Sequence, residues 1–501
     1  MNFTSFHFFF FFLITITVGH FLRKKTRSLR IFLLLASLYF YGVFEPVYLV
    51  LVFVSTAYDY IAALGIEARR EYERTGQHPG RGIMSSLSSG MWLAVSMTLN
   101  LSLLAFFKYT NFGIEIVNDT LPAGDTIFAF PALDILLPVG ISFYTFQSMS
   151  YTIDVYRGQL EARRSVVDFA LYVTFFPQLV AGPIVRATTF FKQMDDPLPV
   201  TYDDIVVGLT RIVSGFFRKL VLADNLAPLV NGVFSGQAEL NPLDIWIGSL
   251  AFGWQIYFDF AGYTDIARGV ARLFGYEFEI NFLYPFSAGN ITDHWSRWHI
   301  SLTTWLRDYL YIPLGGSRVG PFRLYANIFV VWFATGIWHG ASYHFVAWGV
   351  WQFVMVVVHR LFSMTKLREV LNARYKISWG IAARVILFFF LNFGFIWFRA
   401  PDMALATQMQ GRLFGIENLN DIVHGLSAVT LIKTMPASLY FDYIWFLVFL
   451  WVYELYFNYR KLDYFWKPEN RRKLVLLLTA MVFLVLVLAT PDTPNFLYFQ
   501  F

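Results

Sequence analysis

Residues 293–316, DHWSRWHISLTTWLRDYLYIPLGG, combine an apolar, tryptophan-rich background with a density of charge that lipid does not tolerate. The charged side chains are Asp293, Arg297, Arg307 and Asp308. If this stretch is helical, Asp293 and Arg297 lie one turn apart and can form an ion pair. The charges exclude a lipid-facing span and predict a half-inserted helix that lines a cytoplasm-facing cavity.

The same stretch contains the first of two tryptophan-flanked histidines, His299. In a continuous helix, Trp295, His299 and Leu302 would lie along one stripe. A proline and two glycines within residues 313–316 predict the turn that ends this helix.

The second tryptophan-flanked histidine, His339, lies within residues 323–342, RLYANIFVVWFATGIWHGAS. This run predicts a membrane helix as far as Gly336. The glycines Gly336 and Gly340 leave little side-chain bulk beside the imidazole, so a substrate could approach it closely. A titratable imidazole is costly to bury in hydrocarbon, so we expect both histidines to face a cavity or a reacting group. The alternative for each is a buried histidine bonded to a neighbouring group.

The composition of the whole chain is that of a membrane protein. Of its 501 residues, 57% are hydrophobic and 15% are charged, whereas a soluble chain carries about 25% charged residues. Cysteine is absent, which excludes disulfides, thiolate metal sites and a cysteinyl acyl-enzyme. The net charge of +5 fits basic cytoplasmic loops. No basic run accompanies a soluble fold, so we expect no nucleic-acid partner.

The order of apolar and basic segments predicts how the chain crosses the membrane. The first apolar run, Phe3–Leu22, is followed and not preceded by basic residues, so we expect a membrane helix with its N-terminus outside the cytoplasm. Basic loops at residues 67–81 and 157–164 return to the cytoplasm, while residues 118–131 contain no Lys or Arg. Further apolar segments are Ile31–Val43, Val47–Leu64, Met91–Phe107, Phe169–Val185, Ile205–Val221, Trp246–Leu273, Leu324–Val358, Ala382–Phe398, Tyr443–Phe457 and Leu474–Leu488.

The lengths of these segments predict an all-α, polytopic integral membrane protein. Some segments are short for a full span and Leu324–Val358 is long, so we expect re-entrant or paired helices, about ten to twelve in all. No internal repeat is visible in the sequence.

Five ordered motifs carry a resemblance to a known family. They are LPVGISFYTFQ at residues 137–147, DVYRG at 154–158, WHISLTTWLRDYLYIPLGG at 298–316, TGIWHGA at 335–341 and YFQF at 498–501. On these motifs the chain resembles the membrane-bound O-acyltransferase (MBOAT) family, specifically its bacterial alginate O-acetyltransferase (AlgI-like) branch. The resemblance implies one membrane domain over residues 1–501 with a catalytic core at 135–360, in which helices surround a transmembrane tunnel.

The resemblance also implies roles for the two histidines. His339 matches the signature histidine, which closes the tunnel near its middle, and His299 matches a second polar position. A hydroxyl is a poor nucleophile at neutral pH, so its attack on an acetyl thioester needs a base. An imidazole with a pKa near 6.5 suits this task and is worth about 10²- to 10⁴-fold in rate. We assign the base to His339. His299 could orient the donor, donate to the carbonyl oxygen as charge develops, or hold the acceptor.

The implied acyl donor is cytosolic acetyl-CoA, and no metal is expected. Arg297, Arg307 and Arg318 would lie where the phosphates of coenzyme A arrive, although no Gly-rich phosphate cradle accompanies them. The resemblance implies a multi-pass protein of the bacterial inner membrane, surrounded by membrane lipids. It would pass the acetyl group to a separate extracytoplasmic SGNH-type acetyltransferase, for O-acetylation of a surface polysaccharide such as alginate.

Two alternatives remain open at this point. An MBOAT enzyme with another acceptor, such as peptidoglycan, cellulose, teichoic acid, a lipid or a protein, explains the histidines equally well. A secondary transporter explains the hydropathy and the buried ionisable groups, but it predicts a repeat that the sequence does not show.

Other ionisable residues have supporting or undecided roles. We expect His294 and His344 to lie around the site without acting in it. Asp259 and Asp265, in an apolar stretch, either line the tunnel or pair with Arg268. The remaining histidines, interpreted as terminal, loop or interfacial, are His7, His20, His78, His359 and His424.

Overall fold

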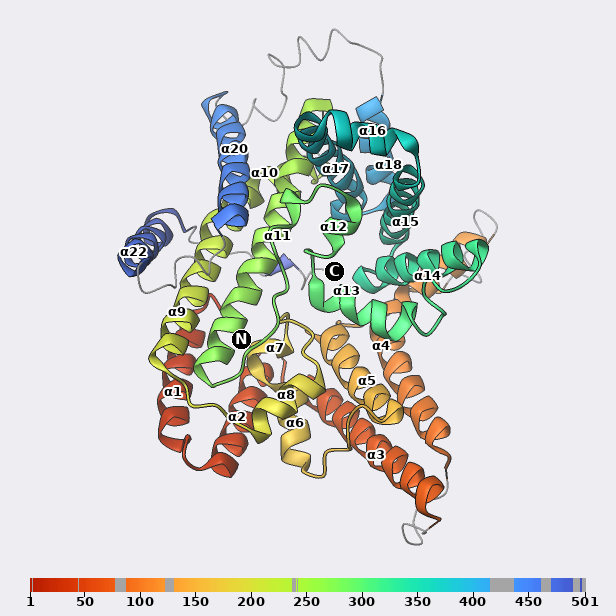
Figure 1. Cartoon of the computed structure of the whole chain (residues 1–501), viewed down its shortest axis with the longest axis vertical. Helices are drawn as coiled ribbons and strands as arrows, with labels where there is room; N and C mark the ends of the chain where they lie inside the picture. Colours follow the sequence, from red (N-terminus) through yellow and green to blue (C-terminus); the bar gives the residue numbers. More distant parts are fainter. Residues whose placement is uncertain are drawn as a thin grey trace. The chain divides into compact units, whose positions relative to one another are not determined.

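The structure, a computed structural model, consists only of helices and their connections in the part of the chain that it describes (Figure 1). The described residues are 1, 3–43, 45–76, 87–121, 130–236, 240, 242–414, 437–460, 470–489 and 496–497. The predicted all-α class is confirmed. The YFQF motif, His78 and His424 lie outside the described residues.

The chain divides into two compact units. The first is Met1–Ile212 with Tyr263–Glu279, and the second is Val213–Gly262 with Ile280–Phe501. Two of the three unit boundaries fall within helices, α9 (Tyr202–Phe216) and α11 (Pro242–Leu273), and the third lies in the connection after α11.

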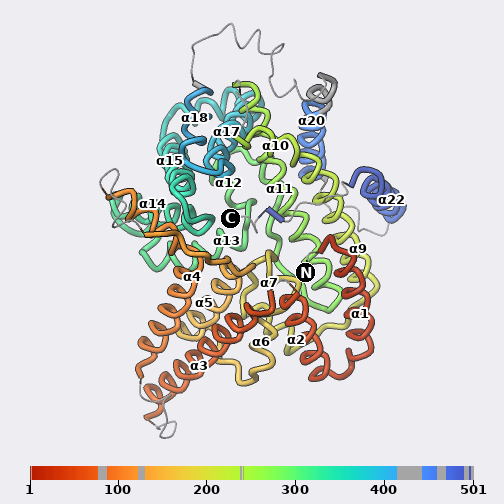
Figure 2. The backbone as a smooth tube through the Cα atoms, turned by 180° about the vertical axis from the view of Figure 1, so that it is seen from behind, coloured from red at the N-terminus to blue at the C-terminus, as the bar shows by residue number. Residues whose placement is uncertain are grey.

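The first unit contains most of the N-terminal helices, red to yellow in Figure 1. They are α1 (Phe6–Leu22), α2 (Thr26–Gly42), α3 (Tyr48–Thr75), α4 (Ser89–Thr120), α5 (Ile141–Arg157), α6 (Val166–Thr174), α7 (Phe176–Leu179) and α8 (Ala187–Asp195). Helices α3, α4 and α5 pack against one another, as Figure 2 shows from behind. A Cβ atom on Gly65 of α3 would clash with Trp92 of α4, so glycine permits this close approach. Asp59 on α3 accepts a hydrogen bond from Asn100 of α4 at 2.9 Å.

One predicted span in this unit is not a single helix. The segment Phe169–Val185 contains the end of α6 and the short α7, separated at Phe175, which has φ −52° and ψ 113°. Pro177 has no backbone N–H to donate to the carbonyl oxygen of Val173, and its ring would clash with that carbonyl in a continuous helix, so a new helix starts here instead. Every residue of the segment is buried. Its apolar composition therefore reflects burial inside the protein and not contact with lipid.

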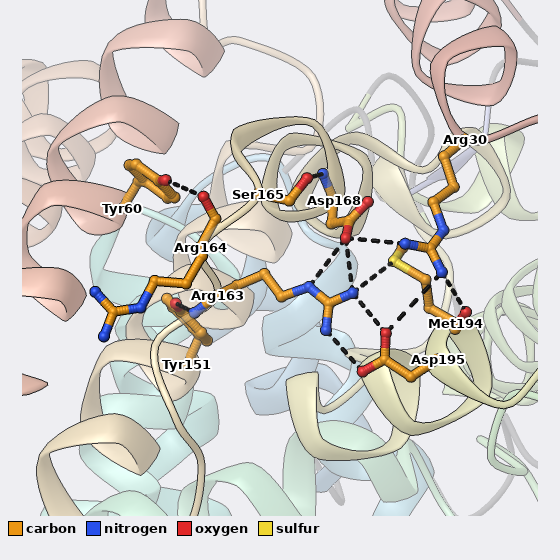
Figure 3. A network of polar contacts seen from close by, with 9 residues as sticks. All are labelled: Arg30, Tyr60, Tyr151, Arg163, Arg164, Ser165, Asp168, Met194 and Asp195. Carbon is orange, nitrogen blue, oxygen red and sulfur yellow. Dashed lines mark hydrogen bonds and ion pairs between the residues drawn. The ribbon is translucent and has the colours of Figure 1, made fainter. Parts of the chain in front are cut away.

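An ion-pair network joins α2, α6 and α8 in the first unit (Figure 3). Asp168 Oδ2 on α6 lies 3.0 Å from Arg30 Nη1 and 2.6 Å from Arg163 Nη2. Arg163 Nη2 also lies 2.6 Å from Asp195 Oδ1 on α8. Hydrogen bonds from Arg163 hold the pKa of Asp195 below its usual range. The network therefore links the short helices α6 and α8 to α2.

Arg163→Met is expected to lower the free energy of unfolding by about 1–3 kcal/mol, because Asp168 is buried and loses a charged partner. The pKa of Asp195 is depressed in the folded state, so its contribution is present above the ordinary carboxylate pKa of about 4. That contribution is lost as the pH falls through the lower folded value. Thermal unfolding in detergent measures the effect. The melting temperature of Arg163→Met should lie further below that of the wild type at pH 7 than at a pH below 4.

Arg164→Met is the matched control, because the Arg164 side chain is 71% exposed and pairs only at the surface with Glu67. This variant should unfold within about 1 kcal/mol of wild type. An equal loss of stability in both variants would show that the Arg163 network stabilises the protein no more than the exposed pair of Arg164 and Glu67 does.

The second unit holds both tryptophan-flanked histidines. Its elements after α9 are η2 (Phe217–Ala223, a π-helix), η3 (Asp224–Leu226), α10 (Ala227–Val233), most of α11, η4 (Pro285–Ser287), α12 (Ile291–Trp295), α13 (Ile300–Leu306), η5 (Arg307–Tyr311, a π-helix), α14 (Pro321–His339), α15 (Tyr343–Ser363), α16 (Lys366–Arg374), α17 (Lys376–Arg399), α18 (Met403–Phe414), α20 (Ala437–Arg460) and α22 (Arg471–Leu488). The long apolar segment Leu324–Val358 is indeed a pair of helices, α14 and α15, which pack together. Among the described helices, α3, α4, α15 and α17 are long and apolar enough to cross a membrane.

Candidate functional site

His339 is the last residue of α14, at the corner where the chain turns into α15. Its side chain is buried, and the residue is 5% exposed. The imidazole centroid lies 4.9 Å from the Trp338 ring, 5.0 Å from Trp348 of α15 and 5.0 Å from Phe398 of α17. Three helices therefore surround one imidazole with aromatic rings, which restrict its position.

The two glycines beside His339 have a different function from the one predicted. A Cβ atom on Gly336 would lie 2.6 Å from the carbonyl oxygen of Phe345, and one on Gly340 would overlap the Phe345 ring. The space that the glycines leave is filled by α15, so it does not admit a substrate. The glycines instead let α14 and α15 approach closely, and this packing fixes the corner that carries His339.

His299 interrupts the helix predicted for residues 293–316. Helix α12 ends at Trp295 and α13 begins at Ile300, and His299 between them has the left-handed backbone values φ 43° and ψ 52°. The prediction of one continuous stripe through Trp295, His299 and Leu302 is therefore wrong. A non-glycine residue in this conformation costs about 1–3 kcal/mol, and such residues cluster at functional sites.

Two other predictions for this stretch are confirmed. Arg297 Nε lies 2.7 Å from Asp293 Oδ1, so these two side chains form the expected pair. The chain turns at residues 313–316, where Gly315 and Gly316 have positive φ angles of 106° and 55°.

Asn281, which is not among the residues predicted for the site, is a polar partner of His299. Its side-chain oxygen lies 3.3 Å from His299 Nδ1 and accepts hydrogen bonds from the backbone N–H and the hydroxyl of Ser301, at 3.2 and 2.9 Å. Its backbone oxygen accepts from the N–H of Ile300 at 2.9 Å. An asparagine in an irregular segment carries no sequence signal that distinguishes it from a turn residue.

The structure brings the two histidines to one aromatic ring. The Trp338 centroid lies 4.9 Å from the His339 ring and 5.9 Å from the His299 ring. Phe260 of α11 meets the His299 ring edge-on at 4.7 Å. His299 is 1% exposed. Both predicted catalytic side chains therefore belong to one buried cluster in the second unit.

The three predicted donor-site arginines are not joined by the contacts of the described residues. Arg297 is paired with Asp293, and Arg307 Nε lies 2.7 Å from its neighbour Asp308. Arg318 is exposed in the turn that follows η5. Two of the three guanidinium groups thus already have carboxylate partners.

The two undecided aspartates have different partners. In the first unit, Asp265 pairs with Arg268 at 3.7 Å. In the second unit, Asp259 Oδ1 lies 2.5 Å from Lys219 Nζ, which also lies 2.8 Å from Asp224 Oδ1. All three side chains of this second group are buried, so Lys219 balances two carboxylates inside the protein.

His294 and His344 bond to backbone oxygens near the site. His294 Nδ1 lies 3.0 Å from the carbonyl oxygen of Pro285, and His344 Nδ1 lies 2.8 Å from that of Trp397. These bonds connect neighbouring segments, which supports the structural interpretation of both residues. No group of three or more His, Asp or Glu side chains among the described residues is arranged to hold a metal ion.

Comparison with known proteins identifies the family. A model described as "MBOAT, membrane-bound O-acyltransferase family" matches residues 157–399, which include both histidines. The chain is 37% identical to the "Probable alginate O-acetylase AlgI" of Pseudomonas aeruginosa over 416 residues, or 83% of this chain and 75% of that protein. The chain belongs to the membrane-bound O-acyltransferase family. As an MBOAT protein it is an O-acyltransferase, and the buried histidine cluster lies within the family's matched region.

Two further MBOAT relatives cover most of the chain. The "Probable alginate O-acetylase AlgI" of Pseudomonas putida is 34% identical over 517 aligned residues, which cover 100% of both chains. The "Peptidoglycan O-acetyltransferase" of Helicobacter pylori is 33% identical and covers 78% of this chain and 75% of that protein. The predicted likeness to the alginate branch of the MBOAT family is confirmed.

Proposed function

We propose that this O-acyltransferase takes an acetyl group from cytosolic acetyl-CoA and passes it outward for O-acetylation of a surface polysaccharide of the alginate kind. The single observation that carries the proposal is the buried cluster in the second unit, in which the rings of His299 and His339 both lie against Trp338. Two imidazoles buried beside one ring suit a reaction in which a proton is transferred at a site shielded from bulk water.

The chemistry proposed for His339 is general base catalysis. The imidazole removes the proton of the acceptor hydroxyl while the hydroxyl oxygen bonds to the acetyl carbon. The bond between that carbon and the sulfur of acetyl-CoA breaks, and the proton passes from the imidazole to the departing thiolate. The products are an acetyl ester and free coenzyme A, so no oxidant or metal is required.

We propose that the phosphates of acetyl-CoA bind near Arg297, Arg307 and Arg318. Of these, Arg318 is the best placed to contact a phosphate. Its side chain is exposed, whereas Arg297 and Arg307 each have an adjacent carboxylate. The basic residues within positions 67–81 and 157–164 support a cytoplasmic position for the donor entrance and an extracytoplasmic N-terminus. We further propose a bacterial inner-membrane location and an SGNH-type acetyltransferase as the extracytoplasmic partner. Residues 135–360 stay the proposed catalytic core, because both histidines lie within them.

Peptidoglycan is the second candidate acceptor, because one relative that covers most of the chain is named a peptidoglycan O-acetyltransferase. The names of the two Pseudomonas relatives favour alginate. Both candidates require a hydroxyl acceptor, so the buried histidine cluster does not discriminate between them.

Acetyl-CoA labelled in the acetyl group, given to the purified full-length chain with its extracytoplasmic partner, tests the donor and the direction together. We expect free thiol to appear at the rate at which label reaches an O-acetyl ester, because one bond breaks as the other forms. The same assay with succinyl-CoA measures donor selectivity. Movement of unchanged substrate across proteoliposomes, with no thiol released, would instead support the transporter alternative.

A further inference from the structure

Two hydrogen-bond donors and one ring nitrogen converge on the side-chain oxygen of Asn281. The backbone N–H of Ser301 can only donate, so the Asn281 atom that lies 3.2 Å from it is the amide oxygen and not the amide nitrogen. The Ser301 hydroxyl, 2.9 Å away, donates to the same atom. The orientation of the Asn281 amide is therefore decided by its neighbours.

The same oxygen lies 3.3 Å from Nδ1 of His299. An amide oxygen has lone pairs and no proton, so this contact is a hydrogen bond only if His299 carries its proton on Nδ1. We infer that Asn281 fixes His299 in its Nδ1–H form, so that neutral His299 meets the substrate as a hydrogen-bond acceptor through Nε2. Asn281 is thus a positioning residue, and this inference about its effect on substrate rests on the proposed function.

Burial and backbone contacts hold this arrangement in place. Asn281 and His299 are each 1% exposed, so water does not readily exchange the proton between the two ring nitrogens. The backbone bond from Ile300 N–H to Asn281 ties the two segments together at 2.9 Å. The edge-on Phe260 ring limits rotation of the imidazole. The left-handed backbone of His299 is the local conformation that these contacts maintain.

The assigned proton position decides between the roles left open for His299. A neutral imidazole that carries its only proton on Nδ1 cannot also donate from Nε2 to a developing oxyanion. The doubly protonated ring could donate, but an isolated charge at a site this buried is costly. His299 is therefore left to orient the donor or to hold the acceptor, in either case by accepting a substrate N–H or O–H.

The proton position can be measured without any assay of activity. The protein labelled with ¹⁵N-histidine, in lipid nanodiscs, contains nine histidines, and the His299 signals are those missing from His299→Gln. We expect a protonated Nδ1 and an unprotonated Nε2 for His299 in the wild type. In Asn281→Leu we expect a mixture of both forms, because the acceptor is gone. A wild-type His299 protonated on Nε2 would overturn the inference.

Acyl-transfer kinetics of two variants test the positioning role. Asn281→Leu should lower kcat by about 10²-fold with little change in KM, because a misdirected ring still lets substrate bind. Asn281→Asp keeps an acceptor for all three donors, so it should keep the wild-type proton position. Its carboxylate also favours the charged ring, so the acid limb of the pH–rate profile should move to higher pH. An unchanged kcat and proton position in Asn281→Leu would contradict the inference.

Asn327→Leu is the matched control for loss of a buried asparagine. Asn327 is 5% exposed and donates to the carbonyl oxygens of Leu314 and Gly316, at 3.2 Å each. Its kcat, measured per folded protein, should stay within about 3-fold of wild type, since its hydrogen bonds go to the turn at residues 314–316 and to neither histidine. If His299→Gln keeps full activity while wild-type His299 shows the expected Nδ1–H signal, the assignment of the proton is correct. His299 then has no role in the proposed mechanism.

Discussion

Replacement of His339 by alanine should lower the kcat of acetyl transfer by about 10²- to 10⁴-fold, the range that general base catalysis contributes. The imidazole is held by three aromatic rings, each about 5 Å away. The measurement is the rate of labelled ester formation by the full-length chain with its partner, normalised to folded protein. The KM for acetyl-CoA should change little, because the base acts mainly in the transition state.

His344→Gln is the control, because His344 is also buried beside the α14–α15 corner and bonds a backbone oxygen through Nδ1. Glutamine can donate to the same oxygen, so this variant should retain wild-type kcat. Equal rates for wild type and His339→Ala would show that the proton leaves by another group. Equal losses in His339→Ala and His344→Gln would indicate a packing defect in place of a catalytic one.

Lys219→Met should produce the largest loss of stability among the variants considered, about 3–5 kcal/mol, because it leaves two buried carboxylates without their cation. Lys219 Nζ lies 2.8 Å from Asp224 and 2.5 Å from Asp259, and the two aspartate side chains are each 2% exposed. Asp259 also accepts a hydrogen bond from the backbone N–H of Leu497 at 2.9 Å. The midpoint of thermal unfolding in detergent, followed at fixed protein and lipid concentration, measures the effect.

A charge-balanced variant separates the loss of charge from the loss of packing. In Lys219→Met combined with Asp224→Asn and Asp259→Asn, all three charges are absent. The buried polar groups then cost far less than unpaired ions. This triple variant should recover at least half of the stability lost in Lys219→Met. If it is no more stable than the single variant, the ion pairs do not account for the effect.

The helical class and the helix pair α14–α15 follow from local properties of the chain. An apolar run such as Leu324–Val358 is too long for a single crossing, so two helices are the simplest solution. The pairing of Asp293 with Arg297 is also local, because residues four apart in a helix are neighbours. Such features need only the spacing of residues along one segment.

The interruption at His299 could not be predicted in the same way. The pattern of residues 293–316 is compatible with a continuous helix, and nothing in it marks a left-handed residue. The conformation depends on Asn281, 18 residues earlier, whose two oxygens accept hydrogen bonds from the start of α13. Likewise, the apolar segment Phe169–Val185 is buried by neighbours in its own unit, and its composition resembles that of a lipid-facing span.

The sequence alone identifies His299 and His339 as chemical candidates, since an imidazole within an apolar, tryptophan-rich run is unusual wherever the segment lies. It also identifies the family, because motifs are read along the chain. Only the tertiary structure shows that both imidazoles meet the Trp338 ring, that Asn281 orients one of them, and that Lys219 pairs with Asp259. These contacts join residues from separate segments, and their geometry depends on how the helices pack, which no local pattern of residues specifies.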